Sequence, residues 1–365
     1  MEQEMKKVSL LSLLIIVSSV CLAETALPER WTEKMSNEWD RIEVKIKSSA
    51  DGSEQPAYFH FPPKARERGG KVPMLVALHT WSCSYKTKNP AAFAATECCR
   101  RGWAFMYPHF RGPNNTPQGC GSDLAVQDIV DCVKWAIANY PVDPDRVYIM
   151  GASGGGHMTL LMAGRHPELF AAAYAGCPIS DVARWHEESS DPKRNLYTVY
   201  ADMMKAACGG TPAEKSAEYA HRSPLTWIEG AKRASLAVSI VTGVHDGHKK
   251  KGGGSVPVGH AIRAFNVLAA EGDRISDSQI ETIERTEQIP PELAFAGTDP
   301  YFRKGQDVLL RRTSGNAQLT IFNAGHAGNF VQGVEWLSLQ RRGAPAQWDV
   351  PPPAGKAKCV NEATK

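Results

Sequence analysis

The chain has 365 residues and a formal net charge of +3, with 42 basic and 39 acidic side chains interspersed along it. This balance lacks the basic stripe typical of nucleic-acid binding, so we expect no nucleic-acid partner and no barrier to neutral substrates. The length is generous for one domain but suits a single α/β domain with insertions.

Residues 1–23 have the pattern of a signal peptide. Two lysines precede an apolar run that is too short for a comfortable membrane span and that ends in small residues. We expect cleavage after Ala23. A lipoprotein site at Cys21 is the lesser alternative, because Val20 before it is not small. The mature chain is therefore expected to be secreted or periplasmic, with no stable membrane anchor.

Of the nine cysteines, eight lie beyond this segment. An even number in an exported chain predicts disulfides but does not fix their pairing.

Strands and helices alternate along most of the chain. Residues 42–48 and 57–61 predict a hairpin, and the continuous apolar run 72–78 predicts a strand buried on both faces. Further expected strands are 103–107, 146–150, 170–175, 236–242 and 319–322, and expected helices are 91–101, 122–139, 158–164 and 261–270. This order predicts a doubly wound, mostly parallel sheet with insertions near the active site. The leading hairpin resembles the one that starts the sheet of an α/β-hydrolase fold, which is the fold we expect.

Two stretches interrupt the alternation, residues 181–230 and 271–312. Long excursions in compact domains are usually functional lids or disordered insertions, so either could shape substrate access. We expect residues 24–338 to form one catalytic domain. The Pro-rich tail 339–365 is expected to be loosely attached.

The most informative motif is Gly-Ala-Ser-Gly-Gly at 151–155, between an expected strand and an expected helix. Small residues on both sides let a serine occupy the strained strand-to-helix turn called a nucleophile elbow. A chance match or a plain glycine-rich turn is the alternative, but the flanking elements favour the elbow. Ser153 is therefore the candidate nucleophile.

A serine nucleophile needs an imidazole to take its proton and a carboxylate to orient that imidazole. In this fold the chain order is serine, acid, histidine, each after a strand. Asp246 follows the strand 236–242, and His326 follows the last strand in a loop rich in small residues. Asp181 and Asp299 are rival acids.

The oxyanion of the intermediate needs two N–H donors. We expect the amides of Gly154 and Trp81 to supply them, with Ser82 as the next candidate and simple packing as the alternative role of Trp81. Trp185 and Asp181 are candidate substrate contacts, although such aromatic residues more often pack and Asp181 could equally anchor its loop.

No metal and no cofactor are expected. His245 and His248 form an HxxH pair near Asp246, but this pair lacks a third and fourth ligand.

With these residues in place, the chain resembles the catalytic domain of the prolyl oligopeptidase family over residues 72–330. The matching motifs are Phe110-Arg111-Gly112, Asp128, Val142-Asp143-Pro144-Asp145-Arg146, Ser223-Pro224 and Val256-Pro257-Val258. The resemblance implies a serine hydrolase that works through an acyl-enzyme.

The chain departs from that family at three points. His79-Thr80-Trp81 stands where His-Gly-Gly is usual, and the 80 residues from Asp246 to His326 are more than the family typically has there. Only about fifty mature residues precede the strand 72–78, which leaves no room for the β-propeller that restricts classical members to short peptides.

Stand-alone exported domains of this kind resemble carboxyl esterases. We therefore expect an esterase acting on small-molecule or oligosaccharide esters, such as acetyl or feruloyl groups of polysaccharides. The alternative is a serine peptidase of the prolyl oligopeptidase family acting on short peptides. A non-catalytic carbohydrate-binding or scaffold protein is a third reading, which an intact triad disfavours.

Overall fold

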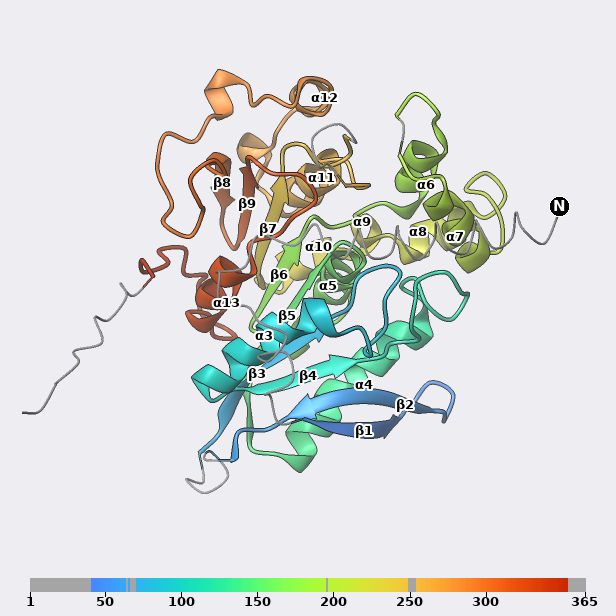
Figure 1. Cartoon of the computed structure of the whole chain (residues 1–365), viewed down its shortest axis with the longest axis vertical. Helices are drawn as coiled ribbons and strands as arrows, with labels where there is room; N and C mark the ends of the chain where they lie inside the picture. The colour runs from blue at the N-terminus through green and yellow to red at the C-terminus, as the bar shows by residue number, and fades with distance from the viewer. Residues whose placement is uncertain (1–40, 64, 66–69, 195, 249–253, 354–365) are drawn as a thin grey trace, which may run out of the picture.

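A computed structural model describes residues 41–63, 65, 70–194, 196–248 and 254–353. The expected signal peptide at 1–23 and the last cysteine, Cys359, lie outside these ranges. A nine-stranded sheet runs through the molecule in the order β1-β2-β4-β3-β5-β6-β7-β9-β8 (Figure 1). None of the described helices is long and apolar enough to cross a membrane.

The sheet is mostly parallel, as predicted, from β4 across to β9. The hairpin β1–β2 and the edge strand β8 run antiparallel to their neighbours. The strands are β1 (Ile42–Lys47), β2 (Glu54–His60), β3 (Val72–Leu78), β4 (Ala104–Pro108), β5 (Val142–Ala152), β6 (Ala172–Gly176), β7 (Ala237–Gly243), β8 (Val308–Ser314) and β9 (Ala317–Phe322). The prediction of a doubly wound α/β-hydrolase sheet is confirmed.

Helices cover both faces of this sheet. The described helices are α3 (Lys88–Arg101), α4 (Asp123–Asn139), α5 (Gly154–Arg165), α6 (Val182–Ser190), α7 (Val199–Cys208), α8 (Ser216–Arg222), α9 (Pro224–Trp227), α10 (Glu229–Arg233), α11 (Gly259–Leu268), α12 (Asp277–Thr286) and α13 (Phe330–Ser338). Residues of α4, α5 and α11 share one apolar core, and those of α3 and α13 share a second.

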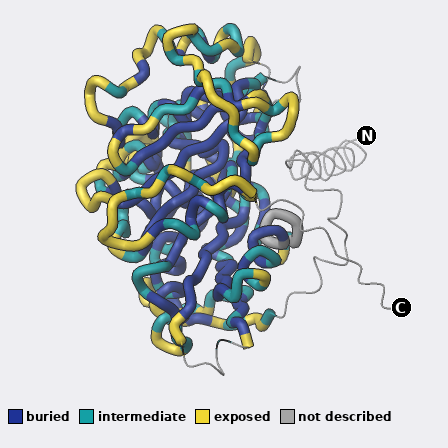
Figure 2. The backbone as a smooth tube through the Cα atoms, turned by 90° about the vertical axis from the view of Figure 1, so that its left-hand side faces the viewer, coloured by how far each residue is buried: buried dark blue, intermediate teal, exposed yellow. Residues whose placement is uncertain are grey.

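Successive side chains of a strand point to opposite faces, and the strand β3 follows this rule. Met74 and Val76 belong to the first core, whereas Leu75 and Ala77 belong to the second. Figure 2 shows the resulting band of buried backbone through the middle of the molecule. The prediction that residues 72–78 form a strand buried on both faces is therefore confirmed.

The two excursions are ordered rather than irregular. Residues 181–230 contain α6 to α10, and a third apolar cluster joins α6, α7 and α8 to Trp81. Residues 271–312 contain α12 and most of β8, an antiparallel edge strand that the sequence pattern did not predict. Its buried and half-buried residues alternate only over the first half of the strand, and the second half carries the polar run Arg311-Arg312-Thr313.

The expectation of disulfides is not met in the described chain. Seven cysteines are described, and none of them forms a disulfide in this structure, although the side chains of Cys120 and Cys208 are hydrogen-bonded to each other. Most are buried within helices or next to strands, where they pack in the apolar cores as small hydrophobic side chains.

The described part of the tail packs against the body. Trp348 stacks on the buried Trp336 at a centroid separation of 5.2 Å, and the Tyr148 hydroxyl donates to the carbonyl of Gln340. This segment is more firmly held than its proline content suggested, because a large aromatic surface is buried beneath it. Residues 354–365 lie outside the described ranges.

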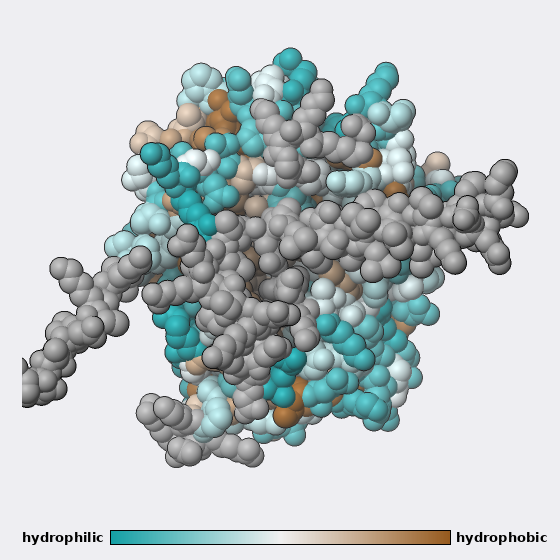
Figure 3. Space-filling view, in the orientation of Figure 1, coloured by the Kyte–Doolittle hydropathy of each residue, from teal (hydrophilic) through white to brown (hydrophobic). Residues whose placement is uncertain are grey.

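On the face shown in Figure 3, the surface that is coloured by hydropathy is mainly hydrophilic. Ile42 and Val331 are the large hydrophobic side chains that stand exposed in the described chain.

Candidate active site

Ser153 occupies the sharp turn between β5 and α5. Its backbone has φ 56° and ψ −120°, a conformation that costs a non-glycine residue free energy and that clusters at functional sites. Its amide donates to the carbonyl of Gly176 at the end of β6. A Cβ at Gly151 would lie 2.5 Å from the backbone of Gly155, so the turn admits only glycine there. The local geometry is that of a nucleophile elbow.

Asp246 and His326 meet across the loops that follow β7 and β9. The Nδ1 atom of His326 lies 2.7 Å from Oδ2 of Asp246, and both side chains are buried. The second carboxylate oxygen of Asp246 accepts a hydrogen bond from the amide of Val256. The two loops run side by side, since the amide of His245 donates to the carbonyl of Ala324. The structure thus joins the acid and the base that the sequence pattern selected.

The electrostatics of the pair suit a general base held by a carboxylate. Burial disfavours a charge on the imidazole, but the carboxylate of Asp246, helped by the thiol of Cys177, outweighs it and raises the pKa of His326 well above its ordinary range. Because Asp246 accepts at Nδ1, the neutral ring presents its lone pair at Nε2. This is the nitrogen that must take a proton from a serine.

The contact of Nε2 was not expected from the sequence. The Sγ atom of Cys177, the residue after β6, lies 3.8 Å from Nε2 of His326. No hydrogen bond joins the Ser153 hydroxyl to the imidazole among the described residues. Such bonds are often long in the absence of substrate and shorten in the substrate complex. The signal that could have indicated Cys177 is its position at the carboxyl end of the strand beside the elbow strand.

The loop after β3 approaches the elbow closely. A Cβ at Gly154 would lie 2.4 Å from the backbone nitrogen of Trp81, so the two backbones touch. The amide of Gly154 lies in the first turn of α5, where helix amides have no partner within the helix. The backbone of Trp81 thus lies against the first turn of α5 next to Ser153, which brings the two residues predicted as oxyanion donors close together.

Buried groups fix this loop in place. The His79 ring stacks on Phe110 at 3.8 Å and lies within hydrogen-bond distance of the carbonyls of His109 and Thr80. Burial lowers the pKa of His79 to about 4, so the ring is neutral at pH 7. The carbonyl of Trp81 accepts from the amide of Asn114.

Trp185, a candidate substrate contact, lies in the third apolar cluster with no exposed surface. Its ring packs edge-on against Trp81 at 4.7 Å and at a tilt against Tyr200, and its Nε1 donates to the carbonyl of Ser255. In this structure it packs against the loop after β3 rather than facing open space.

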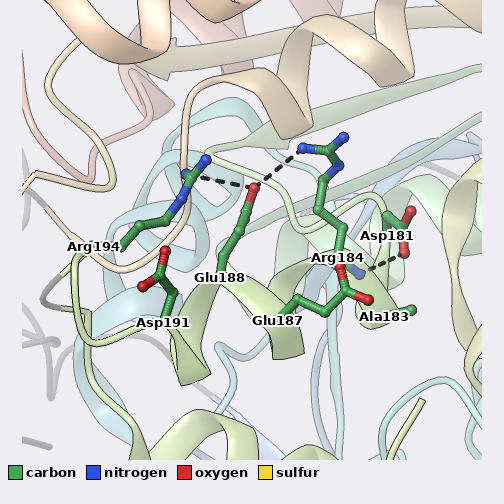
Figure 4. A pocket seen from close by; sticks show the side chains of 7 residues that line it. All are labelled: Asp181, Ala183, Arg184, Glu187, Glu188, Asp191 and Arg194. Carbon is green, nitrogen blue, oxygen red and sulfur yellow. Dashed lines mark hydrogen bonds and ion pairs between the residues drawn. The ribbon is translucent and has the colours of Figure 1, made fainter. Parts of the chain in front are cut away.

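Asp181, the other candidate contact, caps α6 by accepting from the amide of Arg184. It lines a cavity of about 460 Å³ together with Ala183, Arg184, Glu187, Glu188, Asp191 and Arg194 (Figure 4). The figure shows the carboxylate of Glu188 between the guanidinium groups of Arg184 and Arg194. Ser153 is not among the lining residues, so this cavity is separate from the nucleophile.

The rival acids and the HxxH pair are engaged elsewhere. Asp299 forms an ion pair with Arg311 at 2.7 Å. His245 lies 2.5 Å from a carboxylate oxygen of Glu287, and Nε2 of His248 lies 2.7 Å from the carbonyl of Glu284.

Arg111 and Asp128, two of the motif residues, form a bidentate ion pair with distances of 2.6 and 3.0 Å. Arg111 also pairs with Asp51 in the turn between β1 and β2. This ion-pair cluster ties the loop after β4 to α4 and to the first hairpin.

A comparison with protein families agrees with this architecture. The model of the "Prolyl oligopeptidase family" matches residues 94–285, more than half of the chain. The chain belongs to the prolyl oligopeptidase family. This membership places it among the serine hydrolases of α/β-hydrolase fold.

Members and neighbours of the family differ in chemistry. An acylamino-acid-releasing enzyme of Arabidopsis thaliana is 25% identical over 229 residues, which cover 57% of this chain and 30% of that protein. A feruloyl esterase B of Neurospora crassa is 46% identical over 117 residues, 29% of this chain and 39% of that protein.

A solved acylaminoacyl peptidase in complex with Z-Gly-Gly-Phe-chloromethyl ketone shares the fold, with a TM-score of 0.50 and 17% identity. The match covers 63% of this chain and 35% of that one. The chain thus spans less than half the length of each of these proteins, and the comparisons include both an esterase and peptidases.

Proposed function

We propose that this chain is an exported carboxyl esterase that works through Ser153, His326 and Asp246. The observation that carries the proposal is the 2.7 Å contact between His326 and Asp246 at the sheet edge that also holds the strained Ser153. Binding alone requires neither a strained serine nor a paired imidazole, so the arrangement favours catalysis over a scaffold role.

In the proposed reaction, the hydroxyl oxygen of Ser153 attacks the carbonyl carbon of the ester while Nε2 of His326 takes the hydroxyl proton. Asp246 stabilises the resulting imidazolium. The amides of Gly154 and Trp81 hold the negative oxygen of the tetrahedral intermediate. His326 then gives the proton to the departing alcohol, and the reverse sequence with water releases the acid and frees Ser153.

Two points support an ester substrate. The identity to the feruloyl esterase, 46%, is higher than that to the acylamino-acid-releasing enzyme, 25%, although over a shorter segment. The loop after β3 reads His79-Thr80-Trp81 rather than the His-Gly-Gly that is usual in the peptidases of the family. Acetyl or feruloyl esters of oligosaccharides are the proposed substrate class.

A peptidase acting on short peptides is the second candidate. The longer match to the acylamino-acid-releasing enzyme, 229 residues, favours it. Both candidates use the same three side chains, so the leaving group distinguishes them.

The deciding experiment measures kcat/KM on two matched panels with the mature protein. One panel holds 4-nitrophenyl acetate, methyl ferulate and acetylated xylo-oligosaccharides, and the other holds acetyl-alanyl and glycyl-prolyl 4-nitroanilides. We expect turnover of the esters to exceed that of the peptides by about a hundredfold or more, and Ser153→Ala to lower ester turnover by at least about a thousandfold. Peptide turnover equal to ester turnover would select the peptidase.

We also propose export, on the strength of the apolar segment that follows the two N-terminal lysines. Expression of the full chain with N-terminal sequencing of the mature product tests it: the expected first residue is Glu24. Recovery of the uncleaved chain inside the cell contradicts export.

A further inference from the structure

Cys177 contributes a side chain that the proposed reaction does not use. It follows β6 directly, and its amide donates to the carbonyl of Val241 in β7 at 2.7 Å. Its backbone has φ 35°, a left-handed conformation that costs a non-glycine residue free energy. The side chain is 2% exposed and faces the imidazole of His326, which is 8% exposed. A buried thiol on a strained backbone thus lies against His326, the proposed base.

The separation of the two atoms fits a shared metal ion. Zinc binds thiolate sulfur at about 2.3 Å and imidazole nitrogen at about 2.0–2.1 Å, so a tetrahedral angle between them places sulfur and nitrogen about 3.6 Å apart. The observed distance from Sγ of Cys177 to Nε2 of His326 is 3.8 Å. The separation of the two atoms is therefore close to that of two ligands on one zinc ion.

Asp246 completes the arrangement from the other side of the ring. Histidines that bind metals commonly donate their second ring N–H to a carboxylate, which fixes the tautomer and makes the ligating nitrogen more basic. Asp246 accepts at Nδ1 of His326 at 2.7 Å and is itself held by the amide of Val256. Ligand atoms of Cys177, His326 and Asp246 all lie within 4.8 Å of one another.

We propose that Cys177 and His326 form an inhibitory site for a thiophilic divalent cation such as Zn²⁺. On binding, the thiol releases its proton to solvent, a metal–sulfur bond forms, and the lone pair of Nε2 forms the second protein bond. Water fills the remaining positions. The inhibition rests on the proposed function, because it acts by removing the base that Ser153 needs. Mg²⁺ and Ca²⁺ prefer oxygen ligands and do not bind here.

The first experiment measures ester turnover of the mature protein against Zn²⁺ concentration. Wild type is expected to lose at least about tenfold in rate and to recover when EDTA is added, while Mg²⁺ has no effect. In Cys177→Ser, half-inhibition relative to its own metal-free rate requires about 10- to 100-fold more zinc, since one of two protein ligands is lost. The matched control Cys99→Ser, on α3, is inhibited at the wild-type zinc concentration.

The second experiment follows binding without turnover. Co²⁺ added to Ser153→Ala is expected to give the ultraviolet absorption of a cobalt–thiolate bond, which Cys177→Ser in the same background lacks. Asp246→Asn in that background weakens cobalt binding about 10- to 100-fold through the lost hydrogen bond to the ring. Circular dichroism verifies that each variant is folded.

The two experiments separate the two proposals. Equal zinc inhibition of wild type and Cys177→Ser, or no thiolate absorption with Co²⁺, overturns the metal site and leaves the esterase intact. Thiolate absorption in a protein that hydrolyses no ester overturns the esterase and leaves the metal site intact.

Discussion

Among single residues, the local environment of Ser153, Asp246 and His326 gives each side chain the conformation or charge that the proposed reaction needs. Ser153 stands on a strained turn that glycines on both sides make sterically possible. Asp246 is buried, and its two oxygens are satisfied by His326 and by the amide of Val256. The negative charge of Asp246 thereby acts on one imidazole at short range, in a medium where Coulomb interactions are strong.

Asp246→Asn is expected to change both the rate and its dependence on pH. His326 must be neutral to accept a proton, so kcat/KM falls as the pH drops through the pKa of His326. Asp246 raises that pKa against the opposing effect of burial. Removing the negative charge therefore moves the acidic inflection to lower pH, and the loss of tautomer control lowers kcat by about 10⁴-fold. Stopped assays of 4-nitrophenyl acetate between pH 4 and pH 9 measure both effects. An inflection at unchanged pH would falsify this account of His326.

At the scale of elements, the carboxyl ends of β5, β6, β7 and β9 bring the site together. These four strands are adjacent and parallel, so the segments after them reach one edge of the sheet: Ser153, Cys177, Asp246 and His326. Asp246 and His326 are 80 residues apart in sequence, and α11 and α12 lie between them. The loops after β7 and β9 pack so closely that Gly254 has no room for a side chain beside His326, the candidate base.

Gly254→Ala is expected to displace His326. A Cβ at Gly254 would lie 2.1 Å from the Cβ of His326, well inside van der Waals contact. A shift of about 1 Å in a catalytic group costs about a hundredfold in rate, so we expect kcat/KM to fall by that order.

The matched control is Gly272→Ala. An added Cβ at Gly272 has no neighbour within 4 Å, and the variant is expected to keep wild-type turnover. Ester assays and fluorophosphonate labelling of both proteins make the comparison. Full activity in Gly254→Ala contradicts the close packing of the two loops.

In the molecule as a whole, two apolar cores pack on opposite faces of the sheet that carries the candidate site. The tail contributes to the second core. Trp348 covers Trp336, and Arg341 and Arg342 pair with Asp145 at the start of the elbow strand. The end of the described chain is thereby attached to the strand that carries Ser153.

Truncation after Leu339 is expected to destabilise the fold. It exposes Trp336, which has no exposed surface in the intact chain, and removes the hydrogen bond from Tyr148 to Gln340. Loss of packing on this scale resembles a large-to-small change at a buried tryptophan, about 3–5 kcal/mol.

Urea unfolding monitored by tryptophan fluorescence measures the change. The control protein ends at Pro353, keeps every described contact of the tail, and is expected to unfold at the wild-type midpoint. Equal midpoints for the two truncations show that the tail adds nothing to stability.

Local sequence pattern was enough to predict the sheet core and the chain order of the candidate triad. The continuous apolar run 72–78 predicted β3, because a strand buried on both faces has no polar side to alternate with. The glycines around Ser153 indicated an elbow, because the backbones of β5 and α5 pass too close together there to leave room for a side chain. The positions of Asp246 and His326 after late strands selected them over Asp181 and Asp299.

The surroundings of those residues followed from long-range packing and not from local pattern. The short helices of 181–230, the edge strand β8 and the packed tail are stabilised by long-range contacts that local periodicity does not carry. The same holds for Trp185, which the aromatic content of its segment suggested as a substrate contact and which the fold buries against Trp81. Cys177 meets His326 because β6 lies between β5 and β7 in the sheet, a neighbour relation set by strand order. The sequence gives the order of the chemical groups along the chain. Which groups lie close enough to interact depends on which strands are adjacent in the sheet.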